Sequence, residues 1–169
     1  SPYPFRGTDV SVILDVMIHD IDLVLALMRA QPLRVEASGV AVLSSSEDIA
    51  NARLVFASGC VANLTASRIS DERVRRLRVF QEDCYLSMDF QHQTVELARK
   101  VGRMIRRRTI AAARRLPLDE ELAAFVQAVR AGRRPLVSGE EAREALRLAL
   151  RIEHVMRRVK RTTAVYARR

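Results

Sequence analysis

The chain has 169 residues, of which 49% are hydrophobic, so it is long and apolar enough to bury the core of one domain. Its two cysteines provide neither a disulfide framework nor a metal-binding spacing, which excludes a disulfide-rich secreted domain and favours a reducing cytoplasm without a metal site. The formal net charge of +9 is uneven, with −3 over residues 1–90 and +12 over residues 91–169, so the basic character belongs to the C-terminal half.

The first predicted element is a helix from about Asp9 to Met28. Thr8 or Asp9 can cap its first turn, and Pro32 ends the helical pattern. The helix is apolar nearly all round, so we expect it to be buried. Ionisable residues interrupt the apolar run and exclude a bilayer-spanning helix; they are Asp15, His19, Asp20 and Asp22.

Six segments rich in Val, Leu, Ile, Phe and Thr follow, and each is predicted to be a strand. They are residues 34–43, 49–57, 60–69, 74–81, 84–90 and 93–98. Short links such as Ala57-Ser58-Gly59 join antiparallel strands, because parallel strands need long crossovers. The middle of the chain is therefore predicted to form a mostly antiparallel sheet.

The C-terminal part contains an arginine-rich stretch and two predicted helices. Residues 99–115 carry eight basic residues and no acidic one, and no secondary structure is assigned to them. One helix begins near Leu118, and Ser138 with Glu141 has the spacing of a capping box that opens a last helix to about Val159. An opening helix, a six-strand open sheet with helices on one face and two closing helices make an α+β fold.

Asp15, His19 and Asp22 fall on one narrow stripe of the first predicted helix, because residues turn by about 100° each. Burying ionisable groups without partners is costly, so the stripe must find partners or line a cavity. Asp15 and His19 lie four residues apart, where a carboxylate can orient an imidazole that moves a proton on or off a hydroxyl. A core histidine with capping aspartates fits the same pattern, and the residues alone leave both interpretations open.

Several motifs match one family in their order and spacing. They are Asp15-Val-Met-Ile-His19-Asp-Ile-Asp22, Ala52-Arg-Leu-Val-Phe56 followed by Gly59, Ser67-Arg68, Glu121-Leu-Ala-Ala-Phe125, Gly132, Pro135 and Ser138-Gly139. Over nearly the whole chain, these motifs resemble the C-terminal domain of the glucose–fructose oxidoreductase / inositol dehydrogenase / rhizopine catabolism (Gfo/Idh/MocA) family.

The resemblance implies that residues 1–169 form a single domain for substrate binding and oligomerisation in an oxidoreductase that uses NAD or NADP. By resemblance, His19 is the acid/base at the oxidised hydroxyl, and Asp15 orients it or the sugar. In the family, an N-terminal Rossmann domain binds the cofactor and carries a catalytic lysine in a Glu-Lys-Pro motif. Neither that motif nor a G-x-G-x-x-G fingerprint occurs here, so we expect the Rossmann domain to be absent, no cofactor-binding residue to be assignable and the chain to be inactive alone.

Within the family, three segments resemble bacterial enzymes that oxidise the 3-hydroxyl of UDP-N-acetylglucosamine for lipid A variants. They are Asp9-Val-Ser-Val-Ile-Leu-Asp15, Asp48-Ile-Ala-Asn-Ala-Arg53 and Cys60-Val-Ala-Asn63-Leu-Thr-Ala-Ser67-Arg68. The residues then expected to bind a sugar or sugar-nucleotide substrate are Asp22, Arg53, Asn63 and Arg68. An equally weighted alternative is that the sheet face with Arg53 and Asn63 meets a second copy, in a homo-oligomer or a non-catalytic assembly module.

The arginine-rich residues 99–115 allow a third interpretation, which is binding to nucleic acid through phosphate contacts. Aromatic residues are not interleaved with the arginines and no recognised nucleic-acid-binding motif occurs, so this interpretation is the least favoured. Basic loops also occur as solvated surface, or near anionic sugar nucleotides and membranes.

Overall fold

The computed structural model describes residues 10–71, 74–111 and 116–166. The chain divides into two compact units, one made of residues 1–71 and 137–169 and the other of residues 72–136. The first helical segment begins at Ile13, with Val12 as its N-cap residue and no side-chain cap, so the predicted helix start near Asp9 is wrong. The predicted capping residues Thr8 and Asp9 lie outside the described residues.

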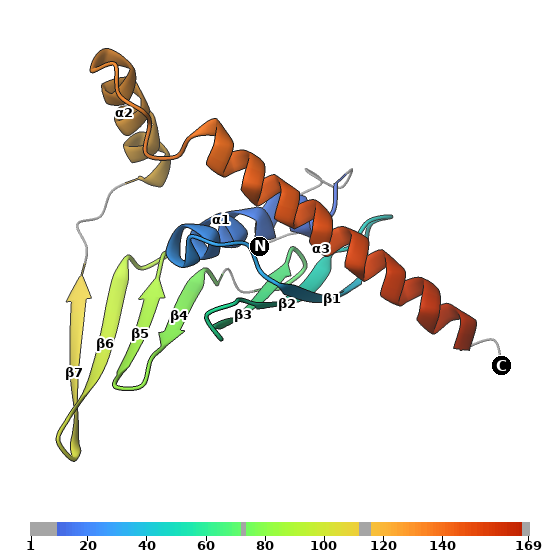
Figure 1. Cartoon of the computed structure of the whole chain (residues 1–169), viewed down its shortest axis with the longest axis horizontal. Coiled ribbons are helices and arrows are strands. Elements are labelled where there is room, and N and C mark those ends of the chain that lie inside the picture. The colour runs from blue at the N-terminus through green and yellow to red at the C-terminus, as the bar shows by residue number, and fades with distance from the viewer. Residues whose placement is uncertain (1–9, 72–73, 112–115, 167–169) are drawn as a thin grey trace. The chain divides into compact units, whose positions relative to one another are not determined.

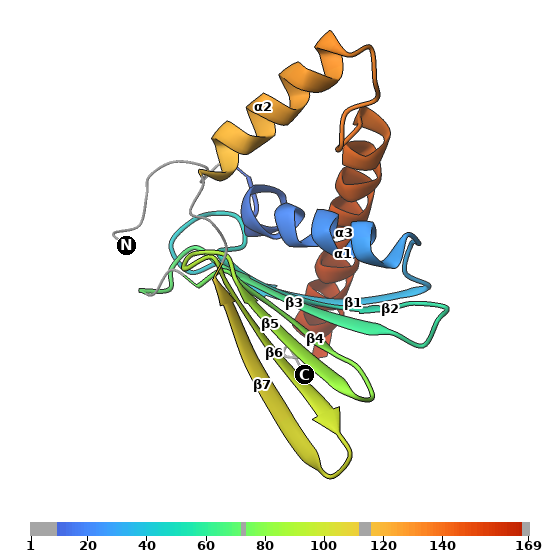
Figure 2. The ribbon, with the colours of Figure 1, turned by 90° about the vertical axis from the view of Figure 1, so that its left-hand side faces the viewer.

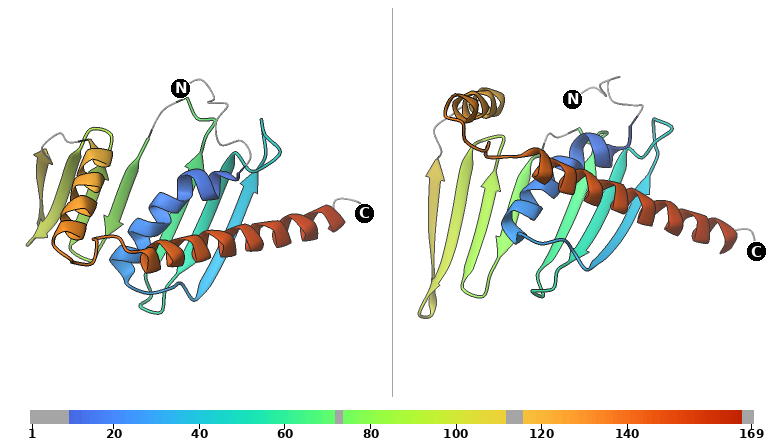
Figure 3. Two further views of the ribbon diagram at one scale, coloured as in Figure 1. Left: turned by 90° about the horizontal axis from the view of Figure 1, so that it is seen from above. Right: turned by 45° about the horizontal axis from the view of Figure 1, so that its top comes forward.

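The first unit packs helices onto one face of a three-stranded antiparallel sheet (Figures 1 and 3). A single π-helical turn, η1 (Ile13–Met17), runs directly into α1 (Ile18–Met28). The sheet has the order β1-β2-β3, formed by β1 (Arg34–Val40), β2 (Ile49–Val55) and β3 (Val61–Ser67). From the C-terminal part of the chain, α3 (Gly139–Tyr166) returns and contacts β1, α1 and η1.

The strands of this sheet alternate between buried and exposed residues, which is the pattern of a sheet covered on one side only. The buried residues of β2 and β3 are Ala50, Ala52, Leu54, Leu64 and Ala66. The intervening side chains, such as Asn51 and Arg53, are exposed. One face of the sheet therefore belongs to the core, and the opposite face carries polar residues.

The core of the first unit lies between the helices and the inner sheet face. Its largest fully buried apolar side chains are Ile13, Met17, Ile21, Leu54, Leu148, Ile152 and Met156. Gly39 allows β1 and α3 to approach closely, because a Cβ atom at this position would collide with the Met156 sulfur. Burial of this apolar surface is the main force that holds α3 on the sheet.

The predicted hairpin at Gly59 and the predicted capping box at Ser138 are confirmed. The hairpin between β2 and β3 closes through Gly59, whose φ of 82° lies in the left-handed region that glycine adopts readily. At the start of α3, the Ser138 amide donates to Glu141 Oε2 at 2.7 Å, and the Glu141 amide donates to Ser138 Oγ at 3.3 Å. This reciprocal pair is the capping box that the sequence predicts.

The second unit contains a four-stranded antiparallel sheet and one helix (Figure 2). The strands follow sequence order and are β4 (Arg76–Phe80), β5 (Cys84–Asp89), β6 (Thr94–Val101) and β7 (Met104–Ala111). Every residue of the outer strand β7 is exposed. The helix α2 (Pro117–Arg130) begins with proline in its first turn and has no buried residue.

The predicted α+β class and the antiparallel pairing are confirmed, but the strand count and the single sheet are not. The structure has seven strands in two sheets of three and four, with β7 added to the six that the sequence predicts. Because both faces of β7 are exposed, no apolar alternation marks it in the sequence. The sheets separate at residues 68–75, where the described residues 68–71 and 74–75 form no strand.

Candidate functional site

Asp15 lies in η1, where the helix changes from the α-helical to the π-helical hydrogen-bond pattern. The Ile18 amide donates to the carbonyl of Ile13, five residues earlier, and this widens the turn around Asp15. Single π-helical turns inside α-helices are frequent at functional sites. The backbone therefore marks the Asp15 end of the helix as a candidate region.

The helix made of η1 and α1 is buried on one side only. Ile13, Met17 and Ile21 face the core, whereas Asp15 and His19 are exposed. Asp22 is half-buried. The expectation of burial all round is therefore wrong, because within the described residues only the sheet and α3 pack against this helix.

Asp15 and His19 lie one helical turn apart on this outer side, but they do not bond to each other. Within residues 10–71, the ion pair of Asp15 is with Arg68, whose Nη2 lies 3.8 Å from Asp15 Oδ2. Arg68 comes from the end of β3, so a distant strand rather than a neighbouring helical residue provides the charged partner of Asp15. Both groups of the predicted pair remain accessible to a molecule that approaches from outside.

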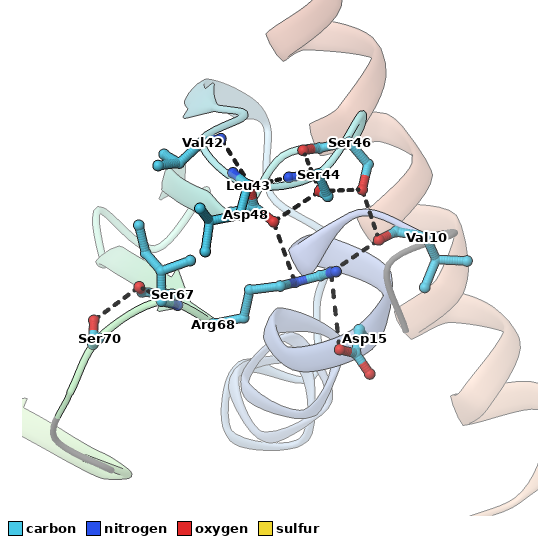
Figure 4. A network of polar contacts seen from close by, with 11 residues as sticks. Val10, Asp15, Val42, Leu43, Ser44, Ser46, Asp48, Ser67, Arg68 and Ser70 are labelled. Atoms are coloured by element: carbon cyan, nitrogen blue, oxygen red, sulfur yellow. Dashed lines mark hydrogen bonds and ion pairs between the residues drawn. The ribbon is translucent and has the colours of Figure 1, made fainter. Parts of the chain in front are cut away.

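The Arg68 side chain is only 5% exposed and lies at the centre of a polar network (Figure 4). Its Nη2 donates to the Val10 carbonyl at 2.9 Å, and its Nε lies 4.0 Å from Asp48 Oδ1. The guanidinium thus joins the residues before η1, the Asp15 carboxylate and the loop between β1 and β2. Arg68, which the sequence predicts to bind substrate, is buried and holds the Asp15 carboxylate and the Val10 carbonyl in place.

Asp48 is fully buried directly before β2 and anchors the loop that follows β1. Its Oδ2 accepts hydrogen bonds from the amides of Val42, Leu43 and Ser44 at 2.8, 2.7 and 3.0 Å. Its Oδ1 accepts a hydrogen bond from the Ser44 hydroxyl at 2.8 Å. Burial on its own raises the pKa of the Asp48 carboxyl, but these hydrogen bonds outweigh burial and hold the pKa well below its usual range.

The same loop also holds the chain where it enters η1. The Ser46 hydroxyl donates to the Val10 carbonyl at 3.0 Å, and the Val12 amide donates to the Glu47 carbonyl at 2.9 Å. The Val10 carbonyl therefore accepts from both Ser46 and Arg68 (Figure 4). Sequence reasoning missed the roles of Ser44, Ser46 and Asp48; three serines and an aspartate directly before a predicted strand are the signal that the sequence contained.

Arg53 and Asn63 lie on the opposite face of the three-stranded sheet from the helices. They are paired across β2 and β3, and both side chains are exposed, next to the buried Leu54 on β2 and Leu64 on β3. Arg53 Nε also lies 3.9 Å from Glu36 Oε2 on β1. The structure therefore brings Asp15, Arg68 and the helix with His19 together, but it does not bring Arg53 and Asn63 to them.

The described residues lack the features of two other kinds of site. They contain no group of three or more His, Cys, Asp or Glu side chains that could hold a metal ion. None of their helices is long and apolar enough to cross a membrane.

The family comparison matches the part of the chain that builds this network. Residues 4–87 match the model of the GFO/IDH/MocA C-terminal domain. A curated relative, the UDP-N-acetylglucosamine 3-dehydrogenase of Acidithiobacillus ferrooxidans, is 37% identical over 158 residues, which is 90% of this chain and 50% of the relative. This chain belongs to the GFO/IDH/MocA family.

Solved structures of the family share the fold. The structure of UDP-N-acetylglucosamine 3-dehydrogenase GnnA from Acidithiobacillus ferrooxidans matches with a TM-score of 0.84 and 37% identity, over 92% of this chain and 50% of that chain. A levoglucosan dehydrogenase in complex with NADH and levoglucosan has a TM-score of 0.75 at 15% identity, over 85% of this chain and 47% of that chain, and shows the fold alone. The chain thus spans about half the length of the family members that it matches.

Proposed function

We propose that this chain is the substrate side of a nicotinamide-dependent oxidoreductase that acts on a hydroxyl of a sugar nucleotide such as UDP-N-acetylglucosamine. The observation that supports it most strongly is the outward-facing pair Asp15 and His19, in a chain 37% identical over 158 residues to a UDP-N-acetylglucosamine 3-dehydrogenase. A core histidine, the alternative left open by the sequence, does not agree with an exposed His19.

In this proposal, His19 exchanges a proton with the sugar hydroxyl, because an imidazole can both accept and donate a proton and this one is exposed to a bound substrate. Asp15 orients the sugar hydroxyl through its exposed carboxylate, which is held in place by Arg68. Asp22, half-buried one turn beyond His19, supports the same side of the helix.

The chain itself does not fit a dinucleotide. Both of its sheets are antiparallel, whereas a dinucleotide-binding fold is built on parallel strands, and the sequence has no G-x-G-x-x-G fingerprint. In the proposal, another domain holds NAD or NADP, and the nicotinamide supplies the hydride-accepting chemistry. The chain contributes the proton-transfer and substrate-orienting groups.

The test compares the 169-residue chain with a fusion in which it replaces the matching half of the Acidithiobacillus relative. Nicotinamide absorbance is followed with NAD and UDP-N-acetylglucosamine, and the unmodified relative serves as the positive control. We expect no turnover by the chain alone and clear oxidation by the fusion. Turnover by the chain alone would contradict the prediction that it is inactive without the other domain. A folded fusion that binds NAD but does not oxidise UDP-N-acetylglucosamine would contradict the proposed function.

We infer a second role for the polar face of the three-stranded sheet, which is contact with another copy of the chain. Arg53, Asn63 and Thr65 lie on this face, away from Asp15 and His19, so they do not belong to the candidate site. An uncovered face of an antiparallel sheet is a common surface for homodimers. This role is compatible with the oxidoreductase and replaces substrate binding for Arg53 and Asn63.

A further inference from the structure

The β6–β7 hairpin carries a concentration of positive charge that the proposed reaction does not use. Residues 97–111 contain six basic residues and no acidic one. They are Arg99, Lys100, Arg103, Arg106, Arg107 and Arg108. Among the described residues, an ion pair reaches only Arg99, from Asp83 at 3.8 Å, so most of this charge is not neutralised within the chain.

The end of this hairpin carries exposed apolar side chains on both strands, next to Arg103 in the turn. The strands meet at the pair Val101 and Met104, joined by a turn in which Gly102 has a φ of 62°. Met104 is 64% exposed and Ile105 is 66% exposed, and Val101 is also exposed. Figures 1 and 2 show that this end projects beyond the turn between β4 and β5 of the same sheet.

Basic residues lie on both faces of the hairpin, directly behind its apolar end. Arg99 pairs with Arg106 across the strands, and Arg107, paired with Ala98, points to the opposite face. The Arg99–Arg106 pair lies two residues, or about 7 Å, from the Val101–Met104 pair. This separation matches the depth to which apolar groups enter the boundary of lipid headgroups and acyl chains, about 5–10 Å.

The basic residues of the hairpin have a simpler explanation, but that explanation does not cover the exposed apolar side chains at its end. Exposed edge strands often carry basic residues because these discourage pairing with the edges of other chains. That explanation accounts for Arg106–Arg108 on β7, but it does not account for Met104 and Ile105, whose exposed apolar side chains favour association. A surface with anionic groups above an apolar layer can bind the basic side chains and the apolar side chains at the same time.

We propose that the β6–β7 hairpin binds the surface of an anionic lipid membrane, with Val101, Met104 and Ile105 in the interface and Arg99 and Arg106–Arg108 at the phosphate level. The long side chain of Arg103 extends from the turn back to the phosphates. Single-stranded nucleic acid is the competing anionic partner, but its binding usually depends on aromatic side chains that stack with bases. Residues 94–111 contain no aromatic residue. The hairpin therefore fits a lipid surface better than a nucleic acid.

The first experiment measures binding of the full chain to vesicles of phosphatidylcholine with one-third phosphatidylglycerol, and to vesicles of phosphatidylcholine alone, in physiological salt. We expect binding to the anionic vesicles only. The triple variant Arg106→Gln, Arg107→Gln, Arg108→Gln should bind about 100-fold more weakly, because each basic residue near an anionic surface contributes about fivefold. These positions are all exposed on β7, so the variant should keep the circular dichroism spectrum of the folded chain.

The matched control removes the same charge elsewhere, with Arg130→Gln, Arg133→Gln and Arg143→Gln, all exposed positions outside the hairpin. This control should retain most of the binding. An equal loss in both triple variants would contradict the proposal, since only net charge would then matter.

A second experiment tests the apolar end. The chain contains no tryptophan, so Met104→Trp introduces a single tryptophan whose emission should shift to the blue on anionic vesicles. Met104→Ser with Ile105→Ser should weaken vesicle binding while leaving the charge unchanged. The proposal is overturned if the Met104→Trp emission does not shift, or if the chain binds single-stranded DNA through Arg106–Arg108 and does not bind anionic vesicles.

Discussion

At the residue scale, the position of Asp15 depends on contacts that begin in the loop between β1 and β2. Asp48 is held ionised by three backbone amides, and its charge faces the Arg68 guanidinium, which in turn contacts Asp15. Arg68 also binds the Val10 carbonyl, so it holds both the entry to the helix and the carboxylate on it. Breaking either end of this network should displace the candidate site.

His19 is the residue on which the proposed chemistry depends most directly. In the active fusion protein, His19→Ala should lower kcat by roughly 10²–10⁴-fold, the usual contribution of a positioned acid or base. His154→Ala is the matched control, because His154 is also exposed but lies on α3. The control should keep a near-normal rate, and a near-normal rate in His19→Ala would contradict the proton-transfer role.

Asp48 should make the stability of the first unit sensitive to acid. Its folded-state pKa lies below the unfolded value of about 3.9, so its contribution is present above that pH and is lost as the pH falls below it. Asp48→Asn should lower the free energy of unfolding by about 3 kcal/mol at neutral pH, because three amide donors and a nearby guanidinium lose their anion.

Thermal unfolding followed by circular dichroism measures this effect. The difference between Asp48→Asn and the unchanged chain should shrink as the pH is lowered below about 4. Asp83→Asn is the control, since Asp83 is 59% exposed and should contribute little at any pH. A constant difference across the pH range would show that Asp48 acts through shape rather than charge.

At the scale of secondary-structure elements, α3 joins the C-terminal part of the chain to the sheet and depends on its capping box. Ser138→Ala should lower the free energy of unfolding by about 1 kcal/mol, because the Glu141 amide loses its side-chain acceptor. Ser138→Asp keeps an acceptor and should retain most of the stability. Urea unfolding checks both variants, and equal midpoints for Ser138→Ala and the unchanged chain would show that the cap does not stabilise α3.

At the scale of the whole molecule, the polar face of the three-stranded sheet should determine the oligomeric state. Light scattering of the purified chain is expected to give the mass of an oligomer. Arg53→Glu should weaken association roughly tenfold or more, because it places like charges on paired faces and opposite Glu36. Arg143→Glu on α3 is the control and should leave the mass unchanged. A monomer at high protein concentration would contradict this prediction.

The sequence by itself determined the features that depend on neighbouring residues. The periodic spacing of hydrophobic residues predicted the first helix and six of the strands. The turn at Gly59 and the cap at Ser138 are also as predicted. These signals are local, since they depend on backbone geometry within a few residues. The motif order along the chain also pointed to the family that the comparisons confirm.

Only the tertiary structure decided which polar residues meet. Arg68 and Asp48 approach the helix from the end of β3 and the start of β2, far away in sequence. The alternation of strands shows that Arg53 and Asn63 share a face, but only the packing of α1 and α3 shows that this face is opposite His19. The physical reason is that the elements packed against a strand or helix determine which of its faces is buried, and these elements can lie far away in the sequence.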